Sequence, residues 1–241
     1  MQTIEPLPRR SPERETPGVD GTFAKVAGPL ALLITAGGAL LLLPALGTAV
    51  LGVTNGAWYL SRSSALVAYF LLWASMICGV SITNKLARLW PGAPTAFELH
   101  RHTSLLGLGF AAVHVLSLLG DTYIGYTLAQ LVVPFASTDY APVWVGLGQI
   151  AFYLLIPVTI SFYARKRLGT RGWRTIHGLS YGLFGLTLLH GLFSGTDSGT
   201  AGTIWLYWFT GSTLLALTGY RVLAVRSAAP RRAGVGASPP R

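Results

Sequence analysis

The residues best suited to chemistry in this chain are five histidines, none of which lies in a terminal segment. His177 and His190 stand thirteen residues apart in a run rich in leucine and glycine, and His100 and His114 stand fourteen apart in an earlier run. Burying imidazole in hydrocarbon is costly, so a histidine inside an apolar run usually serves a function. The spacing of these residues indicates what that function requires.

The two spacings correspond to similar distances along a helix. Fourteen residues rise about 21 Å and thirteen rise about 20 Å. If the two runs cross a membrane in the same direction, each carries one histidine near the inner surface and another nearer the outer surface, at depths that match within about 2 Å. The sequence thus predicts two pairs of imidazoles, one above the other, between two parallel helices.

Angles around each helix distinguish between neighbouring candidates. At about 100° per residue, His114 lies within roughly 40° of His100 around the helix axis, fourteen residues on. His102 is twelve residues from His114, and the angle between these two is about 120°. His100 and His114 therefore share a face, and His102 is expected to point elsewhere. Thirteen steps leave His177 and His190 about 140° apart on an ideal helix. Tilt, supercoiling or a local 3₁₀ turn must make up that difference, or the groups that the two histidines bind approach the helix from different sides.

Two stacked pairs of imidazoles suit non-covalent haem b. Its iron takes a neutral imidazole on each face, and its ring fits an apolar slot between helices. Zinc fits less well, because no further Cys, Asp or Glu lies at these depths to complete four ligands. An axial methionine is nearly excluded, because the only methionines are Met1 and Met76. Core hydrogen bonding or a proton relay is the alternative use of these histidines.

The elements that must position the histidines are membrane-spanning helices. Of the 241 residues, 51% are hydrophobic and 11% are charged, whereas soluble domains average about 25% charged residues. A span needs about 20 apolar residues. The uncharged runs near or above that length are 26–61, 63–84, 102–120, 140–164, 175–196 and 198–220. They predict an all-α membrane protein, a six-transmembrane helical bundle that binds haem between spans three and five.

The other segments are expected to be a connection and two tails. The run 122–138 contains Gln130 and Pro134, and it is expected to form an interfacial loop or a short helix. Residues 1–25 contain several prolines and charges of both signs, and residues 226–241 are rich in small residues and proline. Both segments are expected to be disordered and cytoplasmic. The haem domain is expected to occupy 26–225.

The net charge of +10 would suit nucleic acid, but its distribution indicates a membrane topology instead. With a cytoplasmic amino terminus and six spans, 17 of the 18 basic residues fall in inner segments, and Arg62 alone lies near the outer surface. This distribution obeys the positive-inside rule and suits contact with anionic lipid. We therefore expect a multi-pass protein of a plasma or inner membrane, with both termini cytoplasmic and no nucleic-acid partner.

Three arginines are candidate ligands for the propionates of haem. Arg62 could bind the propionates of an outer haem or attract an anionic chelate, or it could simply extend to the interface. Arg101 and Arg174 stand near the inner histidines and could hold inner propionates, although membrane topology alone would also place them there.

Three stretches resemble a known family. "LHRHTSLLGLGFAAVHVL" and "WRTIHGLSYGLFGLTLLHGL" resemble the two histidine-bearing helices of the ferric reductase-like transmembrane domain, and the stretch that begins "YLSRSSALVAYF" resembles its second span. The resemblance covers roughly residues 55–225, and the domain is shared with ferric-chelate reductases and NADPH oxidases. It implies two b haems, one held by His100 and His177 and the other by His114 and His190, and electron transfer across the membrane.

The complete enzymes of that family carry a cytoplasmic FAD and NADPH domain after the last span, whereas about 15 residues follow Arg226 here. An electron-transfer component of an oxidoreductase is therefore expected. Its donor would be a cytoplasmic flavin reductase or a quinol, and its acceptor an external ferric chelate or redox protein. Bis-histidine iron passes electrons without binding substrate, so no catalytic residue is predicted. The alternatives are the haem-binding membrane subunit of a periplasmic methionine sulfoxide reductase-type system and a non-redox membrane transporter.

Overall fold

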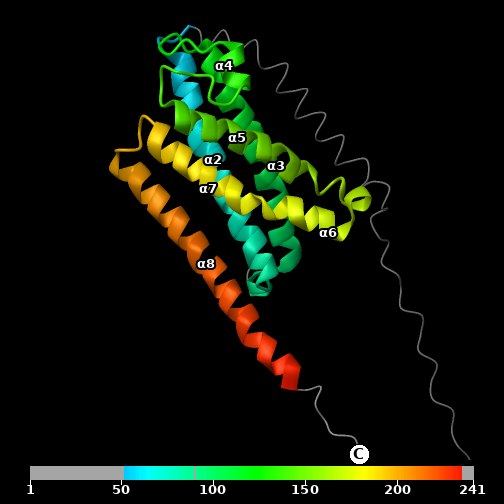
Figure 1. Ribbon diagram of the computed structural model, residues 1–241. Helices are drawn as coiled ribbons and strands as arrows, with labels where there is room; N and C mark the ends of the chain where they lie inside the picture. The colour runs from blue at the N-terminus through cyan, green and yellow to red at the C-terminus, as the bar shows by residue number, and fades with distance from the viewer. Residues whose placement is uncertain (1–51, 90, 235–241) are drawn as a thin grey trace, which may run out of the picture. The chain divides into compact units, whose positions relative to one another are not determined.

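The structure is a computed structural model that describes residues 52–89 and 91–234. Helices follow one another through these ranges, which contain no strand (Figure 1). The helices are α2 (Gly56–Thr83), α3 (Ala93–Ser117), α4 (Leu128–Val132), α5 (Pro142–Ile160), α6 (Arg165–Gly178), α7 (Ser180–Ser194) and α8 (Ala201–Gly234), with 3₁₀ turns η1 (Leu86–Arg88) and η2 (Leu118–Gly120). The predicted all-α class is confirmed for the described residues.

Four helical segments are long and apolar enough to cross a membrane. They are 56–83, 93–120, 142–160 and 165–194, which correspond to the second to fifth predicted spans. The sixth predicted span corresponds to α8, which is not among the four. Most of the first predicted span, 26–61, and the whole of the segment 1–25 lie outside the described residues. The described part therefore has the architecture of a helical membrane protein.

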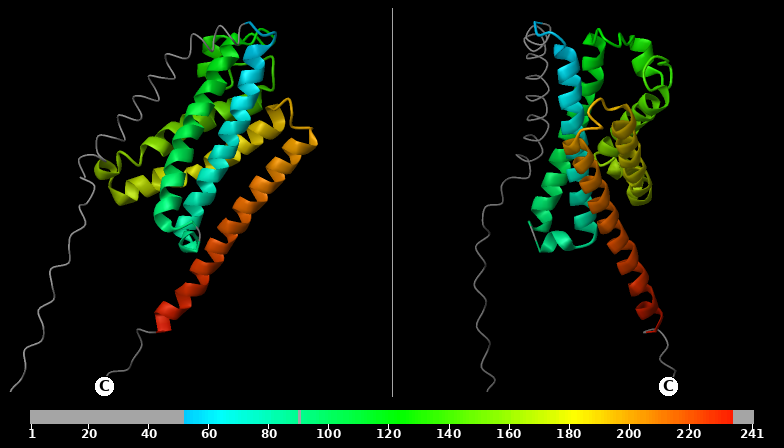
Figure 2. Two further views of the ribbon diagram at one scale, coloured as in Figure 1. Left: turned by 180° about the vertical axis from the view of Figure 1, so that it is seen from behind. Right: turned by 90° about the vertical axis from the view of Figure 1, so that its left-hand side faces the viewer.

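The helices α2 and α3 form an antiparallel hairpin and lie side by side in every view (Figures 1 and 2). Lys85 and Gly92, with φ angles of 62° and 101°, reverse the chain between them. Pro94 stands in the first turn of α3, where its missing N–H costs no helical hydrogen bond. Because the helices are antiparallel, the start of α2 lies opposite the end of α3.

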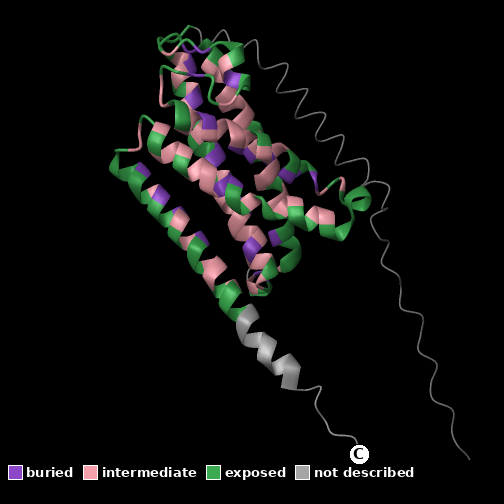
Figure 3. Ribbon diagram, in the orientation of Figure 1, coloured by how far each residue is buried: buried purple, intermediate pink, exposed green. Residues whose placement is uncertain are grey.

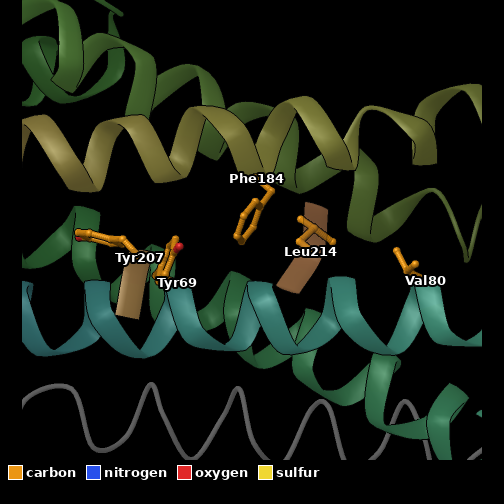
Figure 4. Close-up of a cluster of buried hydrophobic side chains, with 5 residues drawn as sticks. All are labelled: Tyr69, Val80, Phe184, Tyr207 and Leu214. Carbon is orange, nitrogen blue, oxygen red and sulfur yellow. The ribbon is translucent and has the colours of Figure 1, made fainter. Parts of the chain in front are cut away.

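Two buried clusters hold the helices together. Leu72 of α2, Ala151 and Leu155 of α5 and Leu183 of α7 form the first cluster. The second cluster joins α2, α7 and α8, and its buried members are Tyr69, Val80, Phe184, Tyr207 and Leu214 (Figure 4). Tyr69 stacks on Phe184 with ring centroids 5.7 Å apart, which fixes α7 against α2.

Large apolar side chains cover the outside of α8. Its exposed residues lie away from the other helices, while buried residues concentrate where α2, α5 and α7 face one another (Figure 3). Trp205 and Leu215 are each 74% exposed. An apolar exterior of this kind suits a hydrocarbon solvent, in which burial of apolar side chains no longer drives helices together.

The fifth predicted span is not one straight helix. Leu179 separates α6 from α7, and its ψ of −14° departs from the value of about −42° in a regular α-helix towards a 3₁₀ turn. This turn lies between His177 and His190, where a local 3₁₀ turn is one of the explanations left open for the angular difference. Gly169 interrupts α6 a second time, at a φ of 70° that favours glycine.

Two predicted boundaries differ from the structure. α2 begins at Gly56, so Arg62 lies in its second turn and not between two spans. Arg62 pairs with Asp197, so its charge has a partner within this apolar helix bundle. α8 includes 226–234 of the predicted carboxy-terminal tail, and 235–241 lie outside the described residues. The run 122–138 holds the short helix α4, as predicted.

Candidate functional site

Four of the five histidines meet in two pairs between α3 and the α6–α7 segment. The ring centroids of His100 and His177 lie 5.8 Å apart, with ring planes at 82°. Those of His114 and His190 lie 6.2 Å apart, with ring planes at 62°. We call His100 and His177 the first pair, and His114 and His190 the second pair. The structure thus brings together the pairs that matching helical depths predict.

Three of these imidazoles place Nδ1 within hydrogen-bond distance of a backbone carbonyl on a neighbouring helix. A carbonyl can only accept, so Nδ1 carries the proton and donates it. In a neutral imidazole the unprotonated lone pair is then on Nε2, which is the tautomer that a hydrogen bond of this kind fixes in metal-ligating histidines. The bonds join His100 to Ser75 (2.8 Å), His114 to Ser61 (3.0 Å) and His190 to Trp144 (2.9 Å).

Ser61 and Ser75 also bring their hydroxyls to 3.0 Å from Nδ1 of His114 and His100, respectively. Both serines are buried on α2 and were not predicted as site residues. They stand fourteen residues apart, which is the spacing of His100 and His114 on α3. The antiparallel hairpin therefore sets each serine opposite one histidine. A polar spacing repeated in two adjacent apolar runs is the sequence signal that could have revealed them.

His177 is held differently from the other three. Its ring stacks on Trp173 with centroids 5.2 Å apart and planes at 21°, and the Arg165 guanidinium lies 4.8 Å from the centre of the Trp173 ring. Its Nδ1 is buried and makes no hydrogen bond as well formed as the Nδ1 bonds of the other three histidines, although the backbone of Val158 interacts with the ring. Aromatic stacking, rather than a carbonyl, therefore orients this imidazole.

The separation of the rings fits two imidazoles that bind one metal from opposite sides. Each metal–nitrogen bond is about 2 Å and a ring nitrogen lies about 1 Å from its ring centre, so the centroids should be about 6 Å apart. Among the described residues, no group of three or more His, Cys, Asp or Glu side chains could hold a metal ion. Two imidazoles suit a metal that brings its other four ligands in a ring, as haem iron does.

Each histidine pair lines a cavity. The first pair lines a cavity of about 660 Å³ together with Arg101 and Arg174, which is within the range of about 300–1,000 Å³ that is usual for ligand sites. The second pair lines a smaller cavity of about 230 Å³, which is below that range, together with Arg62. Both cavities share the leucine wall, by which we mean Leu72, Leu155 and Leu183.

Arg62 lines the second cavity, but its guanidinium already has protein partners. Its Nε donates to Oδ2 of the Asp197 carboxylate at 2.7 Å, and its Nη2 donates to Oδ1 of the same carboxylate. It also lies 3.9 Å from the centre of the Trp58 ring. Arg62 therefore ties α2 to the connection between α7 and α8 beside the second pair. A role in binding propionate or an anionic chelate stays a prediction, and it would compete with Asp197.

Arg101 and Arg174 both line the first cavity, as a role near the inner histidines requires. The Arg101 guanidinium lies 2.6 Å from the Glu98 carboxylate on the same helix, and both side chains are close to half exposed. The His102 side chain is 63% exposed and bonds the backbone of Glu98 at 2.8 Å. His102 therefore points away from both pairs, in the direction that its helical angle predicts.

The segment 121–141 covers one side of the second cavity, which Asp121, Tyr126 and Tyr140 line. The side-chain amide of Gln149 on α5 donates to two backbone carbonyls of α4, at 2.6 and 2.9 Å. Tyr140 donates its hydroxyl to a backbone carbonyl at the end of α7, at 2.8 Å. Burial raises the pKa of the Tyr126 phenol, so this residue stays neutral beside the cavity.

The helices and their apolar exterior define the class of the molecule as an all-helical membrane protein with paired histidines in its bundle. Within that class, the chain belongs to the family described as a domain of unknown function, DUF8596, whose model matches residues 56–197. The matched part contains both histidine pairs.

One curated relative is the magnetosome protein MamZ of Paramagnetospirillum magneticum (strain AMB-1). It is 27% identical over 120 residues, which cover 49% of this chain and 18% of MamZ. The chain therefore spans less than a fifth of the length of that relative. No solved structure matches the chain.

Proposed function

We propose that this chain is a transmembrane electron-transfer cytochrome that holds two b haems, one between His100 and His177 and one between His114 and His190. The observation that carries the proposal is the orientation of the imidazoles. Three of them donate Nδ1–H to backbone carbonyls and keep Nε2 for a ligand, at ring separations that suit one metal per pair. The family match and the magnetosome relative name no such activity, so the proposal rests on this geometry.

We propose six spans, with α8 as the last one and a further span before α2. In this topology the first pair lies near the cytoplasmic side and the second pair near the outer side. The basic residues of α6 and of the α2–α3 connection then face the cytoplasm, as the positive-inside rule requires. Both termini are cytoplasmic, in a plasma or inner membrane.

The protein contributes orientation and a dry environment. Ser75 and Ser61 hold the α3 imidazoles from α2, and the Trp144 carbonyl holds His190 from α5. The leucine wall gives both cavities an apolar lining. Arg101 and Arg174 can neutralise carboxylates at the mouth of the first cavity. A bound haem would supply a one-electron redox centre at each pair.

Electrons would pass from a cytoplasmic flavin reductase or a quinol to the first pair, then to the second pair, then to an external ferric chelate or redox protein. A membrane potential that is negative inside favours outward movement of an electron by about 2.3 kcal/mol per 100 mV for a full crossing. In this proposal the chain is an electron-transfer component of an oxidoreductase that receives its electrons from such a donor.

Purified full-length protein in sealed liposomes should reduce an external ferric chelate only when a donor is supplied from the other side. NADPH alone should give the rate of protein-free liposomes, and NADPH with a flavin reductase inside, or a membrane quinol, should start the reaction. A rate at the protein-free level with every donor would contradict the proposal. Reduction driven by NADPH alone would contradict the need for a donor partner.

A further inference from the structure

We infer that Gly148 and Gly79 are positioning residues, which let His190 and His100 reach the backbone carbonyls that fix their tautomer. This inference rests on the proposed function for the role of the imidazoles as ligands. Each glycine lines the cavity of its own histidine pair, and the contact that an added Cβ would make is with the imidazole of that pair.

Gly148 lies one helical turn after the carbonyl that His190 uses. Trp144 accepts from Nδ1 of His190 at 2.9 Å, and Gly148 is the residue four positions later on α5. A Cβ on Gly148 would lie 2.5 Å from Nδ1 of His190 and 2.7 Å from both Cγ and Cε1. These distances fall on the body of the ring, so a methyl group and the observed imidazole cannot both be present.

Gly79 repeats this arrangement in the first pair, with a milder clash. Ser75 accepts from His100 at 2.8 Å, and Gly79 lies four positions later on α2. A Cβ on Gly79 would lie 3.3 Å from Cε1 of His100 and 3.5 Å from Nδ1. A shift of a few tenths of an ångström would accommodate it, so the effect should be smaller than at Gly148.

The other two histidines support the same rule. His114 reaches the Ser61 carbonyl, and the residue four positions later is Ala65, whose side chain is a single methyl group. For His177 the corresponding residue after Val158 is Phe162, and Nδ1 of His177 is the one without a good hydrogen bond. A small residue one turn after the carbonyl accompanies each of the three bonds.

The test measures the imidazoles directly, with and without haem. The full chain in liposomes, labelled with ¹⁵N-histidine, should show His190 as a single Nδ1–H tautomer by solid-state NMR. Gly148→Ala should remove that signal and should lower haem content from two per chain towards one, while His100 keeps its signal. Gly182→Ala on α7 and Gly109→Ala on α3 are matched controls, because an added Cβ meets no atom within 4 Å at either position.

The milder variant covers the case in which Gly148→Ala does not fold. Gly79→Ala should shift the His100 signal and the reduction potential of one haem, and it should leave His190 unchanged. An unchanged histidine spectrum in a folded variant of either glycine would overturn the inference. The wild-type chain could prove to hold no haem while Gly148→Ala still alters the His190 tautomer. That result would contradict the proposed function and support the positioning role.

Discussion

His190→Ala is expected to lower haem content from two per chain to one and to reduce transmembrane electron transfer at least tenfold. The variant removes one axial ligand of the second pair, and His114 alone cannot keep a six-coordinate iron. The two histidine pairs line different cavities, so the first pair should keep its haem. A pyridine haemochrome assay and the rate of external chelate reduction measure the two effects.

His102→Ala is the matched control on α3. Its side chain is exposed and contacts the backbone carbonyl and the carboxylate of Glu98, so both haems should remain. His100→Ala, two positions away, should lose the haem of the first pair. The assignment of ligands by helical angle would be wrong if His102→Ala lost a haem while His100→Ala kept both.

We expect slower donor-driven haem reduction, by about tenfold at low salt, when glutamine replaces Lys166, Arg167 and Arg171 in one variant. Electrostatic steering raises association rates about 10- to 1,000-fold, and this variant removes three positive charges. All three side chains are exposed on α6, close in sequence to His177. Arg165 is left intact because it lies over Trp173, which stacks on His177. Stopped-flow reduction by a flavin reductase measures the rate.

A double variant of Lys85 and Arg88 serves as the control for charge alone, since both are exposed on the α2–α3 connection. It should change the rate less, and haem content should stay at two per chain in both variants. The wild-type rate should fall as salt rises, and the triple variant should lose that dependence. Equal rates for the triple variant and wild type at low salt would show that these charges only set topology.

The histidine pairs could be predicted because a helix converts sequence separation into depth. The 14- and 13-residue spacings placed two imidazoles at each of two levels, and the structure brings the same residues to 5.8 and 6.2 Å. The angular mismatch between His177 and His190 left several explanations open, a local 3₁₀ turn among them, and the structure departs from α-helical geometry at Leu179.

The partners of the site residues could not be predicted, because they come from distant parts of the chain. Arg62 pairs with Asp197, 135 residues away, and His190 bonds the backbone of Trp144, 46 residues away. A backbone acceptor leaves no trace in residue type. The helix boundary at Arg62 also differs from the uncharged run, because Arg62 lies within α2 and its partner Asp197 is far away in the sequence.

Haem content of the purified wild-type chain distinguishes a two-haem cytochrome from other uses of the histidine pairs. We expect two b haems per chain by pyridine haemochrome, with the spectrum of low-spin, six-coordinate iron. A value of one would contradict the assignment of a haem to each histidine pair. A chain that is folded, purified with haem available during expression, and free of haem would contradict the account as a whole.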